Sequence, residues 1–453
     1  MESDLRIRRH SSFRPIDPSS PEACPHRVHC EIPTVKRVPL ADELPYRFYP
    51  PRLHPVLLWA SGFLLPAMLR RDHLVSEVDI AGAEHLQPLL ERGDSVLLTP
   101  NHPDHADCYM LFELGRRIRK PFYYMAAYQI FVGKNHWILP RIGVFPVDRE
   151  GADLTAFKSG VDILVKGQNP LVIFPEGEIY HLSDRLTPVR EGAVAIAAAA
   201  AKRLEHGKTI WIVPVALKYR FLEHVDPLPK LLATMEQLET RFTWWPRSDR
   251  SLVDRIYEYA EGVLGLKEYE YLGAVQGGPL KERLEGLART VLDRIEDRRS
   301  GKRREDTVPV RVKELRRACL DTLADPQVTP EQRSRTQRDL HDLFLVVQLF
   351  SYPGDYVRET PTVERISETL MKFGQDFLGD DIPVPHGPRR GIMRLGEPID
   401  VKARLAGAGK ARQAVSALTC DLEARLQHLL DQIGPGRPYA PKPTQSVEIL
   451  QRA

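Results

Sequence analysis

The stretch from Ser76 to about Tyr219 alternates short strand-like runs with helix-like runs. The strand-like runs are rich in β-branched and aromatic residues, as strands are, and they read SEVDIAG, SVLLTP, PFYYMA, PLVIFP and TIWIVPVALKY. The helix-like runs between them read HADCYMLFELGRRIR, DLTAFKSGVDILVKG and REGAVAIAAAAAKRLEHG. This alternation predicts an α/β fold with a mostly parallel mixed sheet flanked by helices. Functional residues of such a sheet lie where strands end and helices begin.

The size and composition of the chain limit its class. Its 453 residues predict two domains, or one domain with a large insertion. Hydrophobic residues make up 42% and charged residues 28%, which is typical of a globular protein. A formal net charge of +3 creates no global field for nucleic acid, so no nucleic-acid partner is expected. Five scattered cysteines are too few for a disulfide framework and favour a reducing compartment.

The segment NHPDHAD, residues 101–107, follows the strand-like run SVLLTP. Pro103 suits the first position of a helix, which would place His102 at the helix mouth and Asp107 about one turn in. In that arrangement the Asp107 carboxylate fixes the tautomer of His102 and raises the basicity of its other nitrogen. The chain contains no GxSxG motif to supply a nucleophilic serine. We therefore expect a hydroxyl group of the substrate to be the nucleophile.

Two other interpretations of this segment stay open at this point. His102, Asp104, His105 and Asp107 are all possible metal ligands, although no HExxH or related spacing is present. Alternatively, Asn101 or Asp104 only caps the following helix. Near the amino terminus, Cys24, His26, His29 and Cys30 also lie close together, but their spacing favours a loop over a zinc site.

Three further segments end predicted strands: RIGVFPVDRE at 141–150, IFPEGEIY at 173–180 and WIVPVALKY at 211–219. Together with NHPDHAD they resemble the four blocks of the glycerolipid acyltransferase family, which includes the lysophosphatidic acid acyltransferases. The matching residues are His102 and Asp107 of HxxxxD; Gly143, Phe145, Asp148 and Arg149; Phe174, Pro175, Glu176 and Gly177 of FPEG; and Val213, Pro214 and Val215. Arg190 and Gly192 resemble the basic residue and glycine that open a helix between the third and fourth blocks.

The resemblance implies a role for each site residue. His102 would be the general base for a lipid hydroxyl and Asp107 its orienting partner, with no acyl-enzyme intermediate and no cofactor. The co-substrate would be an acyl thioester of coenzyme A or acyl carrier protein. Arg149 and Arg190 would bind a phosphate or pyrophosphate through forked hydrogen bonds. Glu176 and Gly177 would form a tight turn that allows close approach of the substrate.

The third block departs from the family pattern, in which threonine or valine, arginine and serine follow FPEG. Here Glu178, Ile179 and Tyr180 follow, so an arginine is missing and a carboxylate stands beside its position. One interpretation is that Arg185 folds back to replace the lost charge, and that lysophosphatidic acid is the acceptor. The other is that Glu178 binds a cationic or hydroxylated head group of another lysolipid or lipid alcohol.

The run from Val56 to Leu69 is the first concentration of apolar residues. With 14 residues and Pro66 inside it, the run is short for a membrane span of about 20 residues. Its aromatic residues and flanking arginines suit a helix in the lipid interface, and a buried helix is the alternative. We expect a peripheral or monotopic protein on the cytoplasmic face of a membrane.

The order of helix-like and strand-like segments along the chain predicts a split catalytic domain. After Tyr219 the segments are helix-like. A strand-like segment follows in RRGIMRLGEPIDV, where GEPIDV resembles a late strand of the family. The alternative is two consecutive domains. The predicted parts are an extended, disordered tail (1–50), an amphipathic interface helix (51–73), the first part of the acyltransferase domain (74–225), a helical insertion (226–388), the last strand and helix of the acyltransferase domain (389–433) and a disordered tail (434–453).

The sequence thus predicts a membrane-associated O-acyltransferase that moves an acyl group from a thioester to the hydroxyl of a lysophospholipid, as in the acylation of 1-acylglycerol 3-phosphate. A catalytically idle lipid-binding or scaffolding protein on the same fold is the alternative. A metal-dependent hydrolase built on the NHPDHAD cluster is a third possibility, which turnover in the presence of a chelator would separate.

Overall fold

A computed structural model describes residues 46–149, 153–205, 207–406 and 411–441 of the chain. The two predicted tails lie largely, and the Cys24 to Cys30 cluster lies entirely, outside the described residues.

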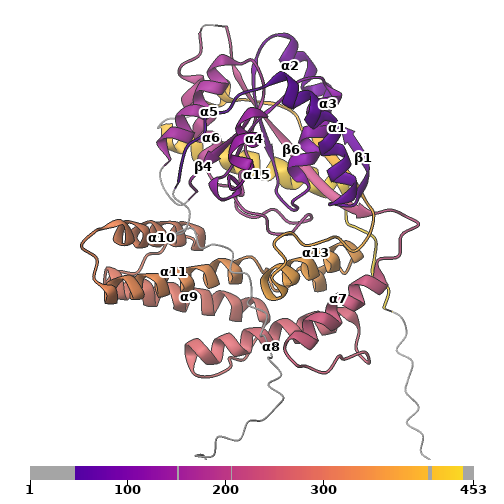
Figure 1. Cartoon of the computed structure of the whole chain (residues 1–453), viewed down its shortest axis with the longest axis vertical. Helices are drawn as coiled ribbons and strands as arrows, with labels where there is room; N and C mark the ends of the chain where they lie inside the picture. Colours follow the sequence, from indigo (N-terminus) through magenta and orange to yellow (C-terminus); the bar gives the residue numbers. More distant parts are fainter. Residues whose placement is uncertain (1–45, 150–152, 206, 407–410, 442–453) are drawn as a thin grey trace, which may run out of the picture. The chain divides into compact units, whose positions relative to one another are not determined.

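The described chain forms an α/β fold around one mixed, mostly parallel sheet (Figure 1). The strands are β1 (Val75–Ala81), β2 (Ser95–Pro100), β3 (Tyr123–Ala127), β4 (Val144–Val147), β5 (Leu171–Val172), β6 (Ile210–Phe221), β7 (Arg389–Leu395) and β8 (Ile399–Asp400). Their order is β1-β7-β6-β2-β5-β3-β4, with β8 paired to β6. All pairings are parallel except those of β6 with β7 and β8. The predicted fold class is therefore confirmed.

The two faces of the sheet carry separate hydrophobic cores, because successive side chains of a strand point to opposite faces. Val96 and Leu98 of β2 pack in the core formed with α1 (Pro55–Arg71), α2 (Gln87–Glu91) and α3 (Asp107–Arg117). Leu97, between them, packs in the core on the other face, with α5 (Leu154–Lys166), α6 (Gly192–Ala201) and α15 (Ala411–Ile433). Every residue of β2 is buried. Burial on both faces explains why this strand reads as a continuous apolar run.

A helical region separates β6 from β7 in the sequence. It contains α7 (Leu228–Arg241), α8 (Leu252–Leu272), α9 (Leu280–Arg299), α10 (Val308–Ala324), α11 (Pro330–Phe350), α12 (Tyr356–Glu359), α13 (Val363–Phe373) and η4 (Gly374–Leu378). The chain then returns to the sheet, where β7 lies between β1 and β6. The predicted pairing of this late strand into the same sheet is thus confirmed, whereas the domain limits stay predictions.

Helix α1 is packed on the core along one face and exposed along the other, and its position in a lipid interface stays a prediction. Leu57 and Leu58 pack against the core shared with α3, and Leu69 is buried. The opposite face exposes four large apolar side chains, Val56, Trp59, Phe63 and Leu64, each more than 60% exposed. Among the described residues, no helix is both long enough and apolar enough to span a membrane.

Candidate active site

The loop that follows β2 is fixed by Asn101, the residue after the strand. Its side-chain amide donates to the Leu217 carbonyl at 3.0 Å, and its Oδ1 accepts the Leu217 N–H at 2.7 Å. This side chain therefore extends the parallel pairing of β2 and β6 by one step beyond the last strand residue. Asn101 does not cap α3, so that interpretation of its role is wrong.

His102 and Asp107 lie together at the end of this loop. His102 Nδ1 is 2.8 Å from Asp107 Oδ2, and because a carboxylate only accepts hydrogen bonds, Nδ1 is the donor. Phe174, at the end of the neighbouring strand segment, stacks on the His102 ring with 4.0 Å between ring centroids. The pair and the stacked ring fix the imidazole plane and its tautomer, with Nε2 as the remaining basic atom.

Asp107 accepts two further hydrogen bonds, one on each oxygen. Tyr219, in the last part of β6, donates its hydroxyl to Oδ1 at 2.6 Å, and the Asp104 N–H donates to Oδ2 at 2.9 Å. The carboxyl group is fully buried. Burial raises the pKa of Asp107, and the hydrogen bonds from His102 and Tyr219 oppose that rise. The carboxyl group is therefore fixed in position beside the imidazole and shielded from solvent.

The helix after this loop begins later than the sequence predicts. The first residue of α3 is Asp107, and Pro103 lies in the loop before it. The reason is Asp104, whose Oδ1 accepts the Ala106 N–H at 2.8 Å and closes a local turn before the helix. The predicted position of Pro103 inside the helix is thus wrong, although Asp107 still reaches His102.

Arg389, the first residue of β7, holds the same loop from the side. Its guanidinium donates to Asp104 Oδ2 at 2.8 Å and to the His73 carbonyl at 3.0 Å. It also lies over the Tyr219 ring, 4.6 Å from the centroid. Although burial alone would raise the pKa of Asp104, the Arg389 guanidinium holds it well below its usual range. Asp104 is therefore a charged structural partner of Arg389.

Glu176 of the FPEG block connects the third block to the first. Its Oε1 accepts the His102 backbone N–H at 2.6 Å, and its Oε2 accepts the Thr187 N–H at 3.0 Å and the Thr187 hydroxyl. The side chain is 4% exposed. Burial raises the pKa of Glu176, and the Thr187 and His102 hydrogen bonds counteract it. Glu176 thus positions the backbone of the histidine.

The two arginines expected to bind phosphate both lie against Gly177. Gly177 has a φ of 78°, and a side chain there would meet the Arg190 guanidinium at 2.9 Å. Arg149 donates to the Gly177 carbonyl, and its Nη1 lies 2.9 Å from Glu178 Oε2. The glycine is therefore needed for the close packing of Arg190 on the turn. Glu178, the unusual residue of the block, neutralises Arg149.

Arg185 makes different contacts from those that a phosphate ligand would make. Its Nη1 lies 2.6 Å from Asp355 Oδ1 and its Nη2 lies 2.6 Å from Glu359 Oε2, both in the helical region. The neighbouring Ser183 donates to Glu368. The loop after FPEG is therefore bound to the helical region. A role for Arg185 in phosphate binding stays a prediction, and it requires Arg185 to leave both carboxylates.

Two further histidines lie beside the loop. The rings of His105 and His181 are 5.9 Å apart between centroids. Burial lowers the pKa of His105 to about 4 and that of His181 to about 3, so both are neutral near neutral pH. No group of three or more histidine, cysteine or acidic side chains is arranged to hold a metal ion among the residues that the structure describes.

Sequence reasoning did not assign Tyr219, Arg389 or the bond from Glu176 to the His102 backbone. Tyr219 lies in the run that carries the fourth block, and β6 runs parallel beside β2, with Pro100 opposite Val215. The position of Tyr219, four residues past that pair, could therefore have indicated that it lies near the loop after β2. The position of Arg389 could not be predicted, because it depends on a strand far along the chain.

Part of the chain matches known proteins. The acyltransferase family profile matches residues 77–218. A 1-acyl-sn-glycerol-3-phosphate acyltransferase of Streptococcus pneumoniae is 31% identical over 110 residues, which are 24% of this chain. The match covers only 39% of the length of that relative. Residues 77–218, with His102 and Asp107 among them, belong to the acyltransferase family.

Proposed function

We propose that the protein is a membrane-associated O-acyltransferase. It transfers an acyl group from a thioester of coenzyme A or acyl carrier protein to the hydroxyl of a lysophospholipid, and lysophosphatidic acid is the preferred acceptor. The bond between His102 Nδ1 and the buried Asp107 carries this proposal. It leaves Nε2 as the base of a ring that Asp107 and the stacked Phe174 hold in place. The intact pair also argues against a catalytically idle lipid-binding protein.

The reaction follows from this pair. The acceptor hydroxyl gives its proton to His102 Nε2 while its oxygen attacks the thioester carbonyl carbon, and the imidazolium that forms is stabilised by Asp107. The tetrahedral intermediate then expels the thiolate, which takes the proton from Nε2. The hydroxyl oxygen ends in an ester, the carrier leaves as a thiol, and the histidine returns to its starting state. No covalent bond to the protein forms.

The acceptor is inferred from the charges beside Gly177. Arg149 and Arg190 provide two guanidinium groups, and Glu178 subtracts one charge from this site. A phosphate that displaces Glu178 from Arg149 would gain a forked, charge-assisted contact. The relative named a 1-acyl-sn-glycerol-3-phosphate acyltransferase favours the same acceptor. The Arg149–Glu178 pair supports one second candidate, an acceptor whose head group is cationic or hydroxylated and binds Glu178.

Membrane association is inferred from the exposed face of α1. Val56, Trp59, Phe63 and Leu64 are exposed while the other face of the helix packs on the core. Arg70 and Arg71 end the helix. Large apolar and aromatic side chains next to basic residues are typical of a helix lying in the lipid interface. We propose that the protein lies at the cytoplasmic surface of a membrane, and the exposed face of α1 supports the contact with lipid.

One assay tests the function. Purified protein is incubated with an acyl-CoA or an acyl carrier protein thioester and, in turn, with lysophosphatidic acid, lysophosphatidylcholine, lysophosphatidylethanolamine and monoacylglycerol. We expect transfer that is fastest to lysophosphatidic acid and that is lost in His102→Ala, whose thermal unfolding should match that of the wild type. Absence of transfer to every acceptor, together with retained lipid binding, would instead support the idle alternative.

A further inference from the structure

The connecting loop, residues 183–189, leads from the FPEG block toward α6, and all of its residues are described by the structure and lie outside helices and strands. Side chains rather than backbone carbonyls accept its N–H groups, at 3.0 to 3.3 Å. The acceptors are Glu368 Oε2 for Ser183, the Tyr356 hydroxyl for Asp184, Gln427 Oε1 for Leu186, Glu176 Oε2 for Thr187 and Glu423 Oε2 for Val189. Because buried backbone groups need partners, these side chains determine the course of the loop.

Asp184 joins the connecting loop to the sheet and to the helical region. Its Oδ1 lies 2.5 Å from Lys218 Nζ of β6, and its Oδ2 accepts a hydrogen bond from Arg365 Nε of α13 at 2.7 Å. Each of the three side chains is at most 10% exposed. Although burial alone would raise the pKa of Asp184, Lys218 and Arg365 hold it below its usual value. Lys218 directly precedes Tyr219, whose hydroxyl donates to Asp107.

Tyr356 of α12 connects the helical region to the backbone of the same loop. Its hydroxyl accepts the Asp184 N–H at 3.2 Å and donates to Glu368 Oε2 at 2.7 Å. Glu368 also accepts hydrogen bonds from the N–H and the hydroxyl of Ser183. The Tyr356 side chain is buried, and the Arg365 guanidinium lies over its ring, 4.5 Å from the centroid. The Tyr356 hydroxyl thus fixes two consecutive residues of the loop at once.

Thr187 carries the position of the loop to the catalytic histidine. It donates both its N–H and its hydroxyl to Glu176 Oε2, and the other oxygen of Glu176 accepts the His102 N–H at 2.6 Å. Leu186, the residue before Thr187, donates its N–H to Gln427 of α15 at 3.0 Å. A displacement of the loop therefore moves Glu176, and with it the backbone of His102.

We propose that Tyr356 and Thr187 are positioning residues of the acyl transfer, through which the helical region sets the place of His102. The inference rests on the proposed function and extends its machinery to α12. A general base must stay within hydrogen-bond reach of the hydroxyl that it deprotonates. A misplacement of about 1 Å in such a group costs roughly 100-fold in rate. The helical region is thus a part of the catalytic apparatus.

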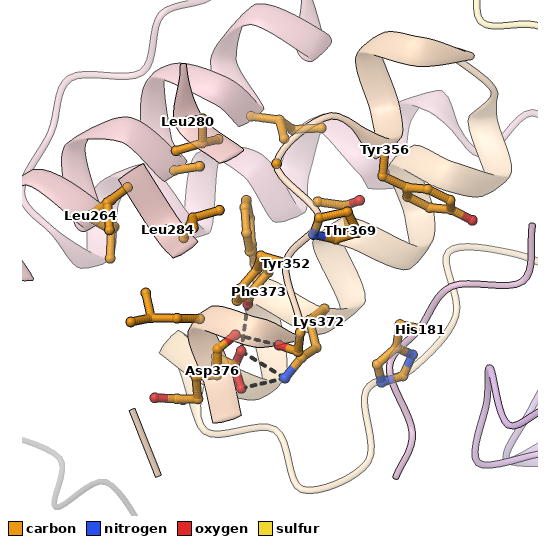
Figure 2. A pocket seen from close by; sticks show the side chains of 18 of the residues that line it. His181, Leu264, Leu280, Leu284, Tyr352, Tyr356, Thr369, Lys372, Phe373 and Asp376 are labelled. Atoms are coloured by element: carbon orange, nitrogen blue, oxygen red, sulfur yellow. Dashed lines mark hydrogen bonds and ion pairs between the residues drawn. The ribbon is translucent and has the colours of Figure 1, made fainter. Parts of the chain in front are cut away.

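The test from the helical side is Tyr356→Phe, which keeps the ring and removes the hydroxyl. We expect kcat to fall about tenfold, as for a misplacement below 1 Å. KM for both substrates should change little, because Tyr356 acts on the base and not on binding. The matched control is Tyr352→Phe. Tyr352 donates to Asp376 at 2.6 Å inside the helical region, and Figure 2 shows this pair apart from Tyr356.

The test from the loop side is Thr187→Val, which keeps the shape of the side chain and removes the hydroxyl bound to Glu176. We again expect kcat to fall about tenfold with KM little changed, since one hydrogen bond to a carboxylate is lost. Thr187→Ser restores the hydroxyl and should restore most of kcat. A Thr187→Ser variant as slow as Thr187→Val would mean that the hydroxyl does not act through Glu176, and would overturn the inference.

A spectroscopic measurement tests the same inference without turnover. In protein labelled with 15N-histidine, the His102 amide is the resonance that is missing in His102→Ala. We expect this resonance to shift in Tyr356→Phe and in Thr187→Val, and to stay in place in Tyr352→Phe. A response of kcat alone or of the amide alone, or equal effects of the two tyrosine variants, overturns the inference. If the wild type transfers nothing to any lysolipid, the proposed function fails instead, and the amide shifts still decide whether the helical region positions His102.

Discussion

Arg389 and Asp104 form a buried ion pair between the first residue of β7 and the loop that carries His102, with 2.8 Å between Nη1 and Oδ2. The two residues are 285 positions apart in the sequence, and the whole helical region lies between them. Strand β7 therefore helps to hold the loop of the active site in place.

The first prediction concerns this pair. Arg389→Ala leaves Asp104 buried without a counter-charge, and the free energy of unfolding should fall by about 3–5 kcal/mol. Urea unfolding followed by circular dichroism measures the change. Arg390→Ala is the control, because Arg390 pairs with Glu77 at an exposed site, where we expect a much smaller loss. Equal losses in the two variants would show that the pair does not hold the loop.

The second prediction separates the partners of His102. Asp107→Asn should lower kcat roughly 100-fold or more, because a mis-set tautomer disables the base. Tyr219→Phe removes one hydrogen bond to a charged group and should lower kcat by about tenfold with KM little changed.

A pH profile distinguishes positioning from mere stability. The Tyr219 hydrogen bond lowers the pKa of Asp107, so the acid limb of the Tyr219→Phe profile should move to higher pH. His105→Ala is the internal control, because the His105 ring is neutral, and its effect on kcat should be much smaller. A dead His105→Ala variant beside an active His102→Ala variant would reverse the assignment within NHPDHAD.

The third prediction uses Glu368 on α13, which accepts hydrogen bonds from Ser183 and Tyr356. Burial raises the pKa of Glu368 to about 8 from its ordinary 4.5. Between these values the unfolded chain has lost a proton that the folded protein keeps, so the free energy of unfolding should fall as pH rises from about 5 to 8. Glu368→Gln should flatten this slope in urea titrations at several pH values, and a variant with the wild-type slope would contradict the assignment.

The fourth prediction concerns the membrane. Deleting α1 would also remove Leu57, Leu58 and Leu69 from the core, so point substitutions on its exposed face are the cleaner test. Trp59→Ser and Phe63→Ser together should reduce cosedimentation with anionic liposomes while leaving thermal unfolding unchanged. Leu266→Ser, at an exposed apolar position of α8, should leave liposome binding unchanged. A wild-type protein that does not bind liposomes would end the membrane proposal.

The sequence predicts the sheet and the central pair well because both depend on local patterns. β2 reads as a buried strand, and the spacing of His102 and Asp107 lets a short loop bring them together. The start of α3 could not be placed as well, because the turn made by Asp104 competes with the Pro103 signal.

Long-range contacts account for what the sequence could not predict. Arg389 reaches the loop only through the order of strands in the sheet. Arg185 pairs with carboxylates of a helical region whose packing on the FPEG loop has no signature in that loop. The pairing of Glu178 with Arg149 could be considered from the sequence alone, since the two residues lie in neighbouring blocks. Only the structure gives the distance between them.

The fifth prediction concerns the acceptor and uses that pair. Glu178 neutralises Arg149 at 2.9 Å, and Glu178→Thr removes this carboxylate while leaving the Gly177 carbonyl that Arg149 also contacts. If lysophosphatidic acid is the acceptor, its KM should fall by about threefold to tenfold in this variant, because one charge-assisted contact no longer has to displace a carboxylate. Arg185→Ala should leave that KM unchanged, since Arg185 is held by Asp355 and Glu359.

If Glu178 instead binds a cationic head group, Glu178→Thr should raise the KM for lysophosphatidylethanolamine and lysophosphatidylcholine. A rise in the KM for lysophosphatidic acid in Arg185→Ala alone would restore Arg185 as the phosphate ligand.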